Sequence, residues 1–148
     1  MAEPRKGVHY AWVCLAQTGL GSVYGLASLL GVFFPILHGV ACGSLLAEAT
    51  QLNIQAMQQR DPANPSLAKY KTIAKCFDPR DKYPDGYTSL VAMLPNWTEE
   101  MAIPKLSHYG MRATDVTQVV AHSRGSSMQT NPIVLTDQEL ATLLQTRL

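Results

Sequence analysis

Two side chains with metal-binding chemistry stand four positions apart in a stretch with helical spacing. They are His38 and Cys42, and residues four apart lie on the same face of an α-helix. A neutral imidazole binds Fe(II) or Zn(II) well, but tight binding needs several ligands that converge from a rigid scaffold. The pair alone is therefore a weak metal signal, and the alternative is a histidine at a helix N-terminus that bonds to backbone or water. No partner spacing marks His9, His108 or His122, which we expect to be surface or capping residues.

The residues around this pair form a long run without formal charge. Gly7 to Ala47 contains no Asp, Glu, Lys or Arg. Such a run can be a membrane hairpin, a buried helix pair or one wall of a metal site. Residues 19–37 are long enough for a membrane span and include a G-x-x-x-G spacing, so a small membrane-associated helical protein is one alternative. Ser22, Ser28 and Pro35 oppose a span, and we expect instead a helix buried in a helical domain.

Tyr24 precedes His38 by fourteen positions, and the two stand in the stretches G-L-G-S-V-Y-G-L-A and H-G-V-A. This order resembles the metal-binding signature of the iron-containing (group III) alcohol dehydrogenase family. That signature reads V-H-G-[LM]-A-x-P-[LI]-G and then P-H-G, with its two ligand histidines at the same spacing. A second similarity lies near the end, where Ser127–Pro132 reads S-M-Q-T-N-P and Leu135–Asp137 reads L-T-D, against the family's S-M-K-x-N-P and L-T-[DE].

The resemblance implies an all-α fold, with residues 1–148 forming a single domain like the C-terminal helical, metal-binding domain of that family. It also implies Fe(II) or Zn(II) and NAD(P) as the cofactors of a complete enzyme. Of four expected ligands only His38 remains, because Tyr24 stands at one ligand position and the other two are expected upstream of these residues. Tyr24 would bind a metal only as a phenolate, and we interpret it as packing in the core or in a pocket. Ser28 stands where the family commonly has a histidine near the nicotinamide, so we interpret it as a possible pocket residue.

Composition limits the function classes further. A chain of 148 residues with a formal net charge of +1 is long enough for one domain and has no basic stripe, which excludes a nucleic-acid partner. No G-x-G-x-x-G follows a strand pattern, so these residues lack the phosphate-binding loop of nicotinamide enzymes. Cys14, Cys42 and Cys76 are widely spaced, which predicts reduced thiols in a cytoplasmic protein, each as a small core residue.

Helical periodicity predicts a series of helices with no strand alternation, over residues 6–17, 22–31, 38–58, from 65 onward, 87–101 and 114–122. Asn64 is expected to cap the helix that begins at Pro65, and Pro95 to kink or break the one after it. Thr136 and Glu139 form a capping box at the start of a last helix. Residues 123–127 are expected to form a turn. On the helix from Pro65, the face predicted to be buried carries Leu67, Tyr70, Ile73, Ala74 and Phe77.

The pattern of retained and missing motifs leads to a hypothesis with an alternative. The chain is interpreted as a fragment or remnant of an iron-dependent NAD(P) alcohol dehydrogenase, not catalytic alone and with no cofactor expected for the chain by itself. The alternative is the helical half of a split dehydrogenase, completed by a separate nucleotide-binding polypeptide. An isolated helical domain exposes the apolar face that a nucleotide domain would cover, which predicts a homo-oligomer or a separate nucleotide-binding subunit.

Overall fold

The computed structural model describes residues 20–77 and 86–148, and every regular element in these two ranges is helical. Seven α-helices and two short 3-10 helices are present there, with no strand. The expected all-α fold is confirmed, whereas the helix expected at residues 6–17 lies outside the described residues. The elements are α2 (Ser22–Phe33), α3 (His38–Arg60), α4 (Pro65–Phe77), α5 (Thr88–Glu100), η1 (Leu106–Tyr109), η2 (Ala113–Asp115), α6 (Val116–His122), α7 (Ser126–Gln129) and α8 (Asp137–Thr146).

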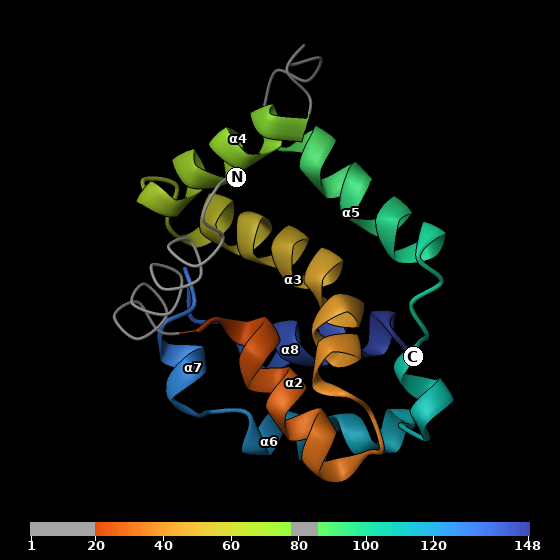
Figure 1. Ribbon diagram of the computed structural model, residues 1–148. Coiled ribbons are helices and arrows are strands. Elements are labelled where there is room, and N and C mark those ends of the chain that lie inside the picture. The colour runs from red at the N-terminus through yellow and green to blue at the C-terminus, as the bar shows by residue number, and fades with distance from the viewer. Residues whose placement is uncertain (1–19, 78–85) are drawn as a thin grey trace, which may run out of the picture.

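Helix α3 crosses the middle of the molecule and separates two groups of helices (Figure 1). The α4–α5 pair packs on one side of α3, and α2 and α8 contact α3 on the other. Helices α6 and α7 contact α2, and α6 also packs against α8. Because α3 contacts α2, α4, α5 and α8, its backbone is held by both groups of helices.

The hydrophobic core follows this division. The main cluster joins α2, α3, α6 and α8 and is centred on the fully buried Leu26, Leu45 and Leu140. Two smaller clusters lie between α3 and the α4–α5 pair, one around Ala47 and Leu90 and the other around Met57, Leu67 and Tyr87. Many of the buried positions of α3 carry small side chains, which allow its neighbours to approach closely: Ala41, Ser44, Ala47, Ala49, Thr50 and Ala56.

The uncharged segment does not form one long helix. Helix α2 ends at Phe33, and Phe34 is extended because a residue before proline is disfavoured in the helical region. Helix α3 begins three residues after Pro35, with Leu37 extended at its N-cap position. In the two described ranges, no helix combines the length and the apolar character that a membrane crossing requires.

Two helix N-termini carry the caps that the sequence predicts. Asn64 Oδ1 accepts the backbone N–H of Ser66 at 2.9 Å, at the start of the helix that begins with Pro65. At the start of α8, the Thr136 hydroxyl accepts the N–H of Glu139, and the Glu139 carboxylate accepts the N–H of Thr136 at 2.6 Å. The same carboxylate binds Arg60 at 2.9 Å, so this cap also ties the end of α3 to the start of α8.

Other details of the prediction were wrong. Ile73 and Phe77 belong to the expected core face of α4, yet 44% and 48% of their surface is exposed, because α4 packs on the core through Leu67, Tyr70 and Ala74. Cys76, expected in the core, is exposed. Helix α5 continues through Pro95 without a break.

Two boundaries near the C-terminal end also differ from the expectation. The helix expected from residue 114 begins at Val116, after the 3-10 turn η2. Residues 123–127 are only partly a turn, because the short helix α7 begins at Ser126.

The side chain of Asn131 joins three segments that are distant in sequence. Its Oδ1 accepts the backbone N–H of Ser22 at 2.9 Å, which satisfies a free donor at the N-terminus of α2. Its Nδ2 donates to Asn53 Oδ1 on α3 and to the Ile133 carbonyl, both at 2.7 Å. Asn131 is only 9% exposed, so these bonds are made in a buried environment where an unpaired amide is costly.

Two glycines, the α2 N-cap Gly21 and Gly25 within α2, allow the C-terminal segment to approach this closely. A Cβ at Gly25 would lie 2.8 Å from Met128 Sδ, and a Cβ at Gly21 would lie 2.9 Å from Asn131 Oδ1. The two sequence stretches that carry the family resemblance, around Tyr24 and from Ser127 to Pro132, therefore pack directly on one another.

We predict that Asn131→Ala lowers the free energy of unfolding by about 2–4 kcal/mol, because it removes the acceptor of the Ser22 N–H and the donor to Asn53 Oδ1 in the interior. Urea denaturation followed by circular dichroism measures this loss. Asn96→Ala is the matched control, since Asn96 is exposed on α5, and its effect is expected within about 0.5 kcal/mol. An Asn131→Ala protein as stable as the wild type would contradict the role given to this amide.

Candidate functional site

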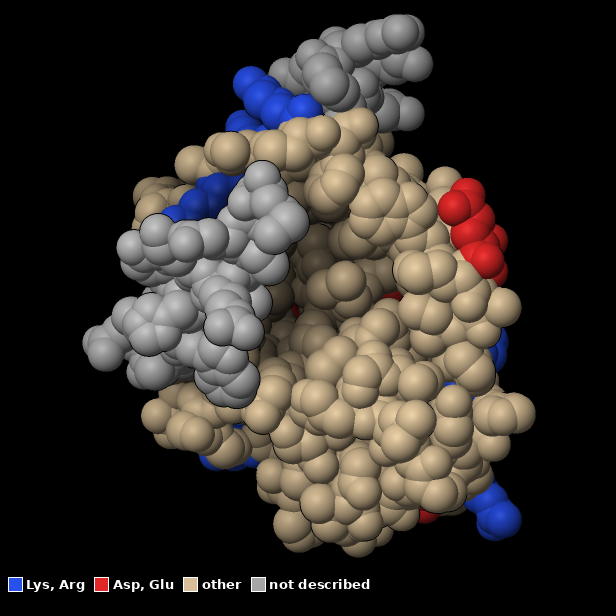
Figure 2. Space-filling view, in the orientation of Figure 1, with Lys and Arg blue, Asp and Glu red and all other residues tan. Residues whose placement is uncertain are grey.

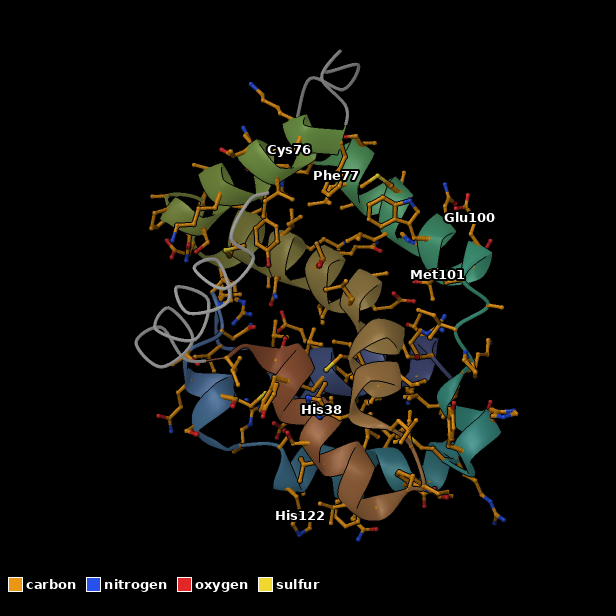
Figure 3. All side chains as sticks on the ribbon, in the orientation of Figure 1. His38, Cys76, Phe77, Glu100, Met101 and His122 are labelled. Carbon is orange, nitrogen blue, oxygen red and sulfur yellow. The ribbon has the colours of Figure 1, made fainter. Side chains whose placement is uncertain are left out.

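His38, Cys42 and Tyr24 come together where the first turns of α3 pass α2. The His38 Nε2 and the Cys42 Sγ are 3.5 Å apart, at hydrogen-bonding distance for sulfur. The Tyr24 ring stands edge-on to the His38 imidazole, with ring centroids 4.7 Å apart and an interplanar angle of 70°. The spacing of fourteen residues thus corresponds to direct contact across the α2–α3 pair. Figure 3 shows His38 at this place, between the two helices.

The contact is open to solvent. His38 is exposed, Cys42 is half-buried, and Tyr24 is 41% exposed. Tyr24 therefore packs against the imidazole at the surface, which contradicts packing in the core, one of the two places expected for it. Ser28 is also exposed on α2, and its hydroxyl donates to the Tyr24 carbonyl at 2.9 Å, within its own helix. Burial raises the pKa of the Cys42 thiol above its ordinary value, so free Cys42 is held as a neutral thiol at neutral pH.

The other described histidines lie apart from this cluster and are exposed, as expected. His122 stands edge-on to Phe33, with centroids 5.8 Å apart, and its Nδ1 lies 2.8 Å from the Gln118 carbonyl within α6. His108 packs against its neighbour Tyr109. His9 lies outside the described residues.

The residues around His38 do not fit the four-ligand metal centre that the family resemblance implies. No group of three or more His, Cys, Asp or Glu side chains converges anywhere in residues 20–77 and 86–148. At His38 the second ligand position carries a phenol, and the charge-free run leaves no carboxylate on α2 or on the first turns of α3. An octahedral Fe(II) centre needs more donors than this arrangement offers.

Three cavities lined by described residues are small. Their volumes are about 170, 280 and 140 Å³, below the ~300 Å³ at which small-molecule pockets usually begin. The first lies between α3 and α8 and contains Glu48 and Thr142. None of the three borders His38. These cavities therefore add no substrate pocket to the group of His38, Cys42 and Tyr24, which we call the histidine cluster.

Glu48 is a carboxylate that the sequence did not single out. Burial raises the pKa of Glu48, and the Arg147 guanidinium and a backbone hydrogen bond offset that rise only in part. Arg147 is held elsewhere, since its Nε donates to Ser44 Oγ at 3.2 Å. Arg147 stands almost a hundred residues after Glu48, so no local pattern marks the pair.

Comparison with solved structures identifies a protein with a similar fold. The fold is similar to that in the crystal structure of a 1,3-propanediol oxidoreductase, with a TM-score of 0.72 and 23% sequence identity. The likeness covers 87% of this chain and 33% of that chain, so this chain spans one third of the length of that relative. This comparison establishes the fold: an all-helical domain of the kind found in that oxidoreductase.

The sequence establishes the family. Residues 5–148 match the model of the Fe-containing alcohol dehydrogenase family, C-terminal, and the chain belongs to that family. A search of curated protein sequences finds no match. The resemblance drawn from Tyr24, His38 and the S-M-Q-T-N-P stretch is therefore confirmed.

We predict that Glu48→Gln makes the protein more stable at pH 7. The pKa of Glu48 is higher in the folded protein than in the unfolded chain, where it is about 4.3. Below pH ~4 the carboxyl is protonated in both states, and its ionisation costs no stability. As the pH rises through the folded-state pKa, the half-buried carboxyl ionises and the protein loses stability. Removing the ionisable group should therefore raise the urea midpoint at pH 7, and the difference should shrink towards pH 4. Glu100→Gln, at the exposed end of α5, is the matched control. A stabilisation that grows as the pH falls would contradict this assignment.

Proposed function

We propose that this chain is a helical domain of the Fe-containing alcohol dehydrogenase type that does not oxidise alcohols by itself. The observation that carries the proposal is the contact between Tyr24 and His38, which puts a phenol where the family pattern has a second metal-binding imidazole. Two further features support it: the absence of converging ligands among the described residues, and the lack of a phosphate-binding loop pattern in the 148 residues. In this proposal the chain provides a helical wall without a complete catalytic centre.

We predict no alcohol oxidation by the purified chain. The assay follows NAD(P)H formation with NAD⁺ or NADP⁺, with Fe(II) or Zn(II) added anaerobically, and with primary alcohols and diols as substrates. The expected rate equals that of the His38→Ala variant and of buffer. A steady rate that depends on His38 would overturn the proposal.

A second candidate is that the chain works with another polypeptide, either a second copy or a separate nucleotide-binding subunit. The specific observation is a set of large apolar side chains left in solvent near the α2–α3 turn, with Val32 and Leu37 each 77% exposed. On the visible face, the part over α2 and the first half of α3 carries almost no charged side chains, and a hollow lies above it (Figure 2). Apolar surface of this kind is typical of protein contact sites. We infer that a second copy covers the apolar side chains of Val32 and Leu37 at the α2–α3 turn when no nucleotide-binding subunit is present.

We predict that the purified chain forms a dimer or larger assembly through the α2–α3 turn. Light scattering coupled to size-exclusion chromatography measures the mass across concentrations. Leu37→Asp should shift the protein to monomer while keeping the fold, since Leu37 is the N-cap of α3 and Asp is a favourable N-cap residue. Val134→Asp, at another exposed apolar position, is the control. A monodisperse wild-type monomer at all concentrations would contradict self-association.

A further inference from the structure

The His38–Cys42 pair has the geometry of a metal chelate that is different from the family's centre. Both side chains belong to α3 and are four residues apart, so one helix alone fixes their separation. We propose that His38 Nε2 and Cys42 Sγ bind a single thiophilic divalent ion of the Zn(II) class, with solvent in the other coordination positions. This site uses neither Tyr24 as a ligand nor any residue of a nucleotide-binding partner, and it is independent of the function proposed above.

The distance between the two donor atoms supports the assignment. Tetrahedral Zn(II), with a Zn–S distance of about 2.3 Å and a Zn–N distance of about 2.0 Å, holds its sulfur and nitrogen donors about 3.5 Å apart. The separation between Sγ and Nε2 is 3.5 Å. An ion can therefore replace the hydrogen between these atoms without a shift of the α3 backbone.

The surroundings hold the imidazole and admit the ion. The Tyr24 ring packs edge-on against His38 and restricts the rotation of the imidazole. His38 is exposed and Cys42 is half-buried, so an ion reaches Nε2 directly from solvent. No Lys or Arg occurs between Gly7 and Ala47, so no side-chain cation on these segments competes for the thiolate.

The N-terminus of α3 opposes a cation, but only weakly. Its partial positive charge costs a cation about 0.3–1 kcal/mol at an exposed site, and the same charge favours the thiolate that replaces the thiol when metal binds. A Zn–thiolate bond outweighs a term of this size. The site releases one proton from Cys42 on binding, and the ion's charge falls from +2 to +1 in the complex.

A thiolate donor sets the metal preference. Sulfur ligands favour Zn(II), and an imidazole–thiolate pair follows the general affinity order in which Zn(II) exceeds Fe(II). The Cys42 sulfur therefore strengthens the preference of this pair for Zn(II) over Fe(II).

The test is an anaerobic titration of a Cys14→Ser/Cys76→Ser protein, in which Cys42 is the sole thiol. Co(II) serves as the spectroscopic probe for a tetrahedral site. We expect a thiolate-to-Co(II) charge-transfer band in the near ultraviolet that saturates at one ion per chain. Zn(II) should remove the band, and Fe(II) should require an at least about tenfold higher concentration to do so.

Variants distinguish metal binding by His38 and Cys42 from metal binding by other side chains. Cys42→Ser should abolish the band, and His38→Ala should weaken binding at least about tenfold. Tyr24→Phe and His122→Ala should leave binding unchanged, since the Tyr24 hydroxyl is not a ligand and His122 lies on α6. Far-ultraviolet circular dichroism confirms that each variant is folded.

Two results would overturn the proposal: no saturable band in the parent protein, or Zn(II) binding that survives Cys42→Ser in a folded protein. Neither result bears on alcohol oxidation, which is measured separately. Conversely, oxidation by the chain alone would refute the proposed function and leave the Co(II) spectrum as the test of this site.

Discussion

The buried amide of Asn131 fixes where α2 lies on α3, and the histidine cluster depends on that placement. One side chain accepts the first N–H of α2, donates to Asn53 in the middle of α3 and donates to the segment before α8. Each of these groups would be costly to bury unpaired, so the three segments are held in one relative position. Tyr24 stands two residues after the N–H that Asn131 binds, and this anchor brings its ring against His38.

The second constraint is the set of small side chains on the buried faces of α3. Small residues on its buried faces let α2 and α8 pack on one side and α4 and α5 on the other, so α3 acts as the shared wall of two helix groups. Two of its polar residues lie where this packing stops, with His38 at the solvent end and Glu48 beside the cavity next to α8, whereas Asn53 is buried and bonded to Asn131. The packing of the neighbouring helices on α3 therefore determines where these polar residues lie.

The sequence predicted those features whose causes are local. A capping box and an Asn-Pro helix start each act within about four residues, and both occur as expected. The exposure of Phe77 and Cys76 was not predictable in this way, because the helical period of α4 does not tell how many neighbours cover it. The bonds of Asn131 to Ser22 and Asn53 join residues 109 and 78 positions apart, and no single-sequence pattern marks such pairs.

The histidine cluster contains one contact within a single helix and one contact between two helices. Helical spacing alone placed Cys42 on the same face as His38, since one helix determines both positions. The contact of Tyr24 with His38 crosses two helices and was indicated only by the family pattern.

The contacts that hold the fold are separate from the cluster of His38, Cys42 and Tyr24. They are the Asn131 amide, the packing of Met128 on Gly25 and the cap that links Glu139 to Arg60, and none of them involves His38 or Tyr24. Tyr24 and His38 are both exposed and contribute little buried surface, so substitutions at these two positions are expected to cost the fold little stability. The fold therefore does not depend on which side chains meet at the exposed α2–α3 contact, and the chemistry of these positions can differ between related domains of one fold.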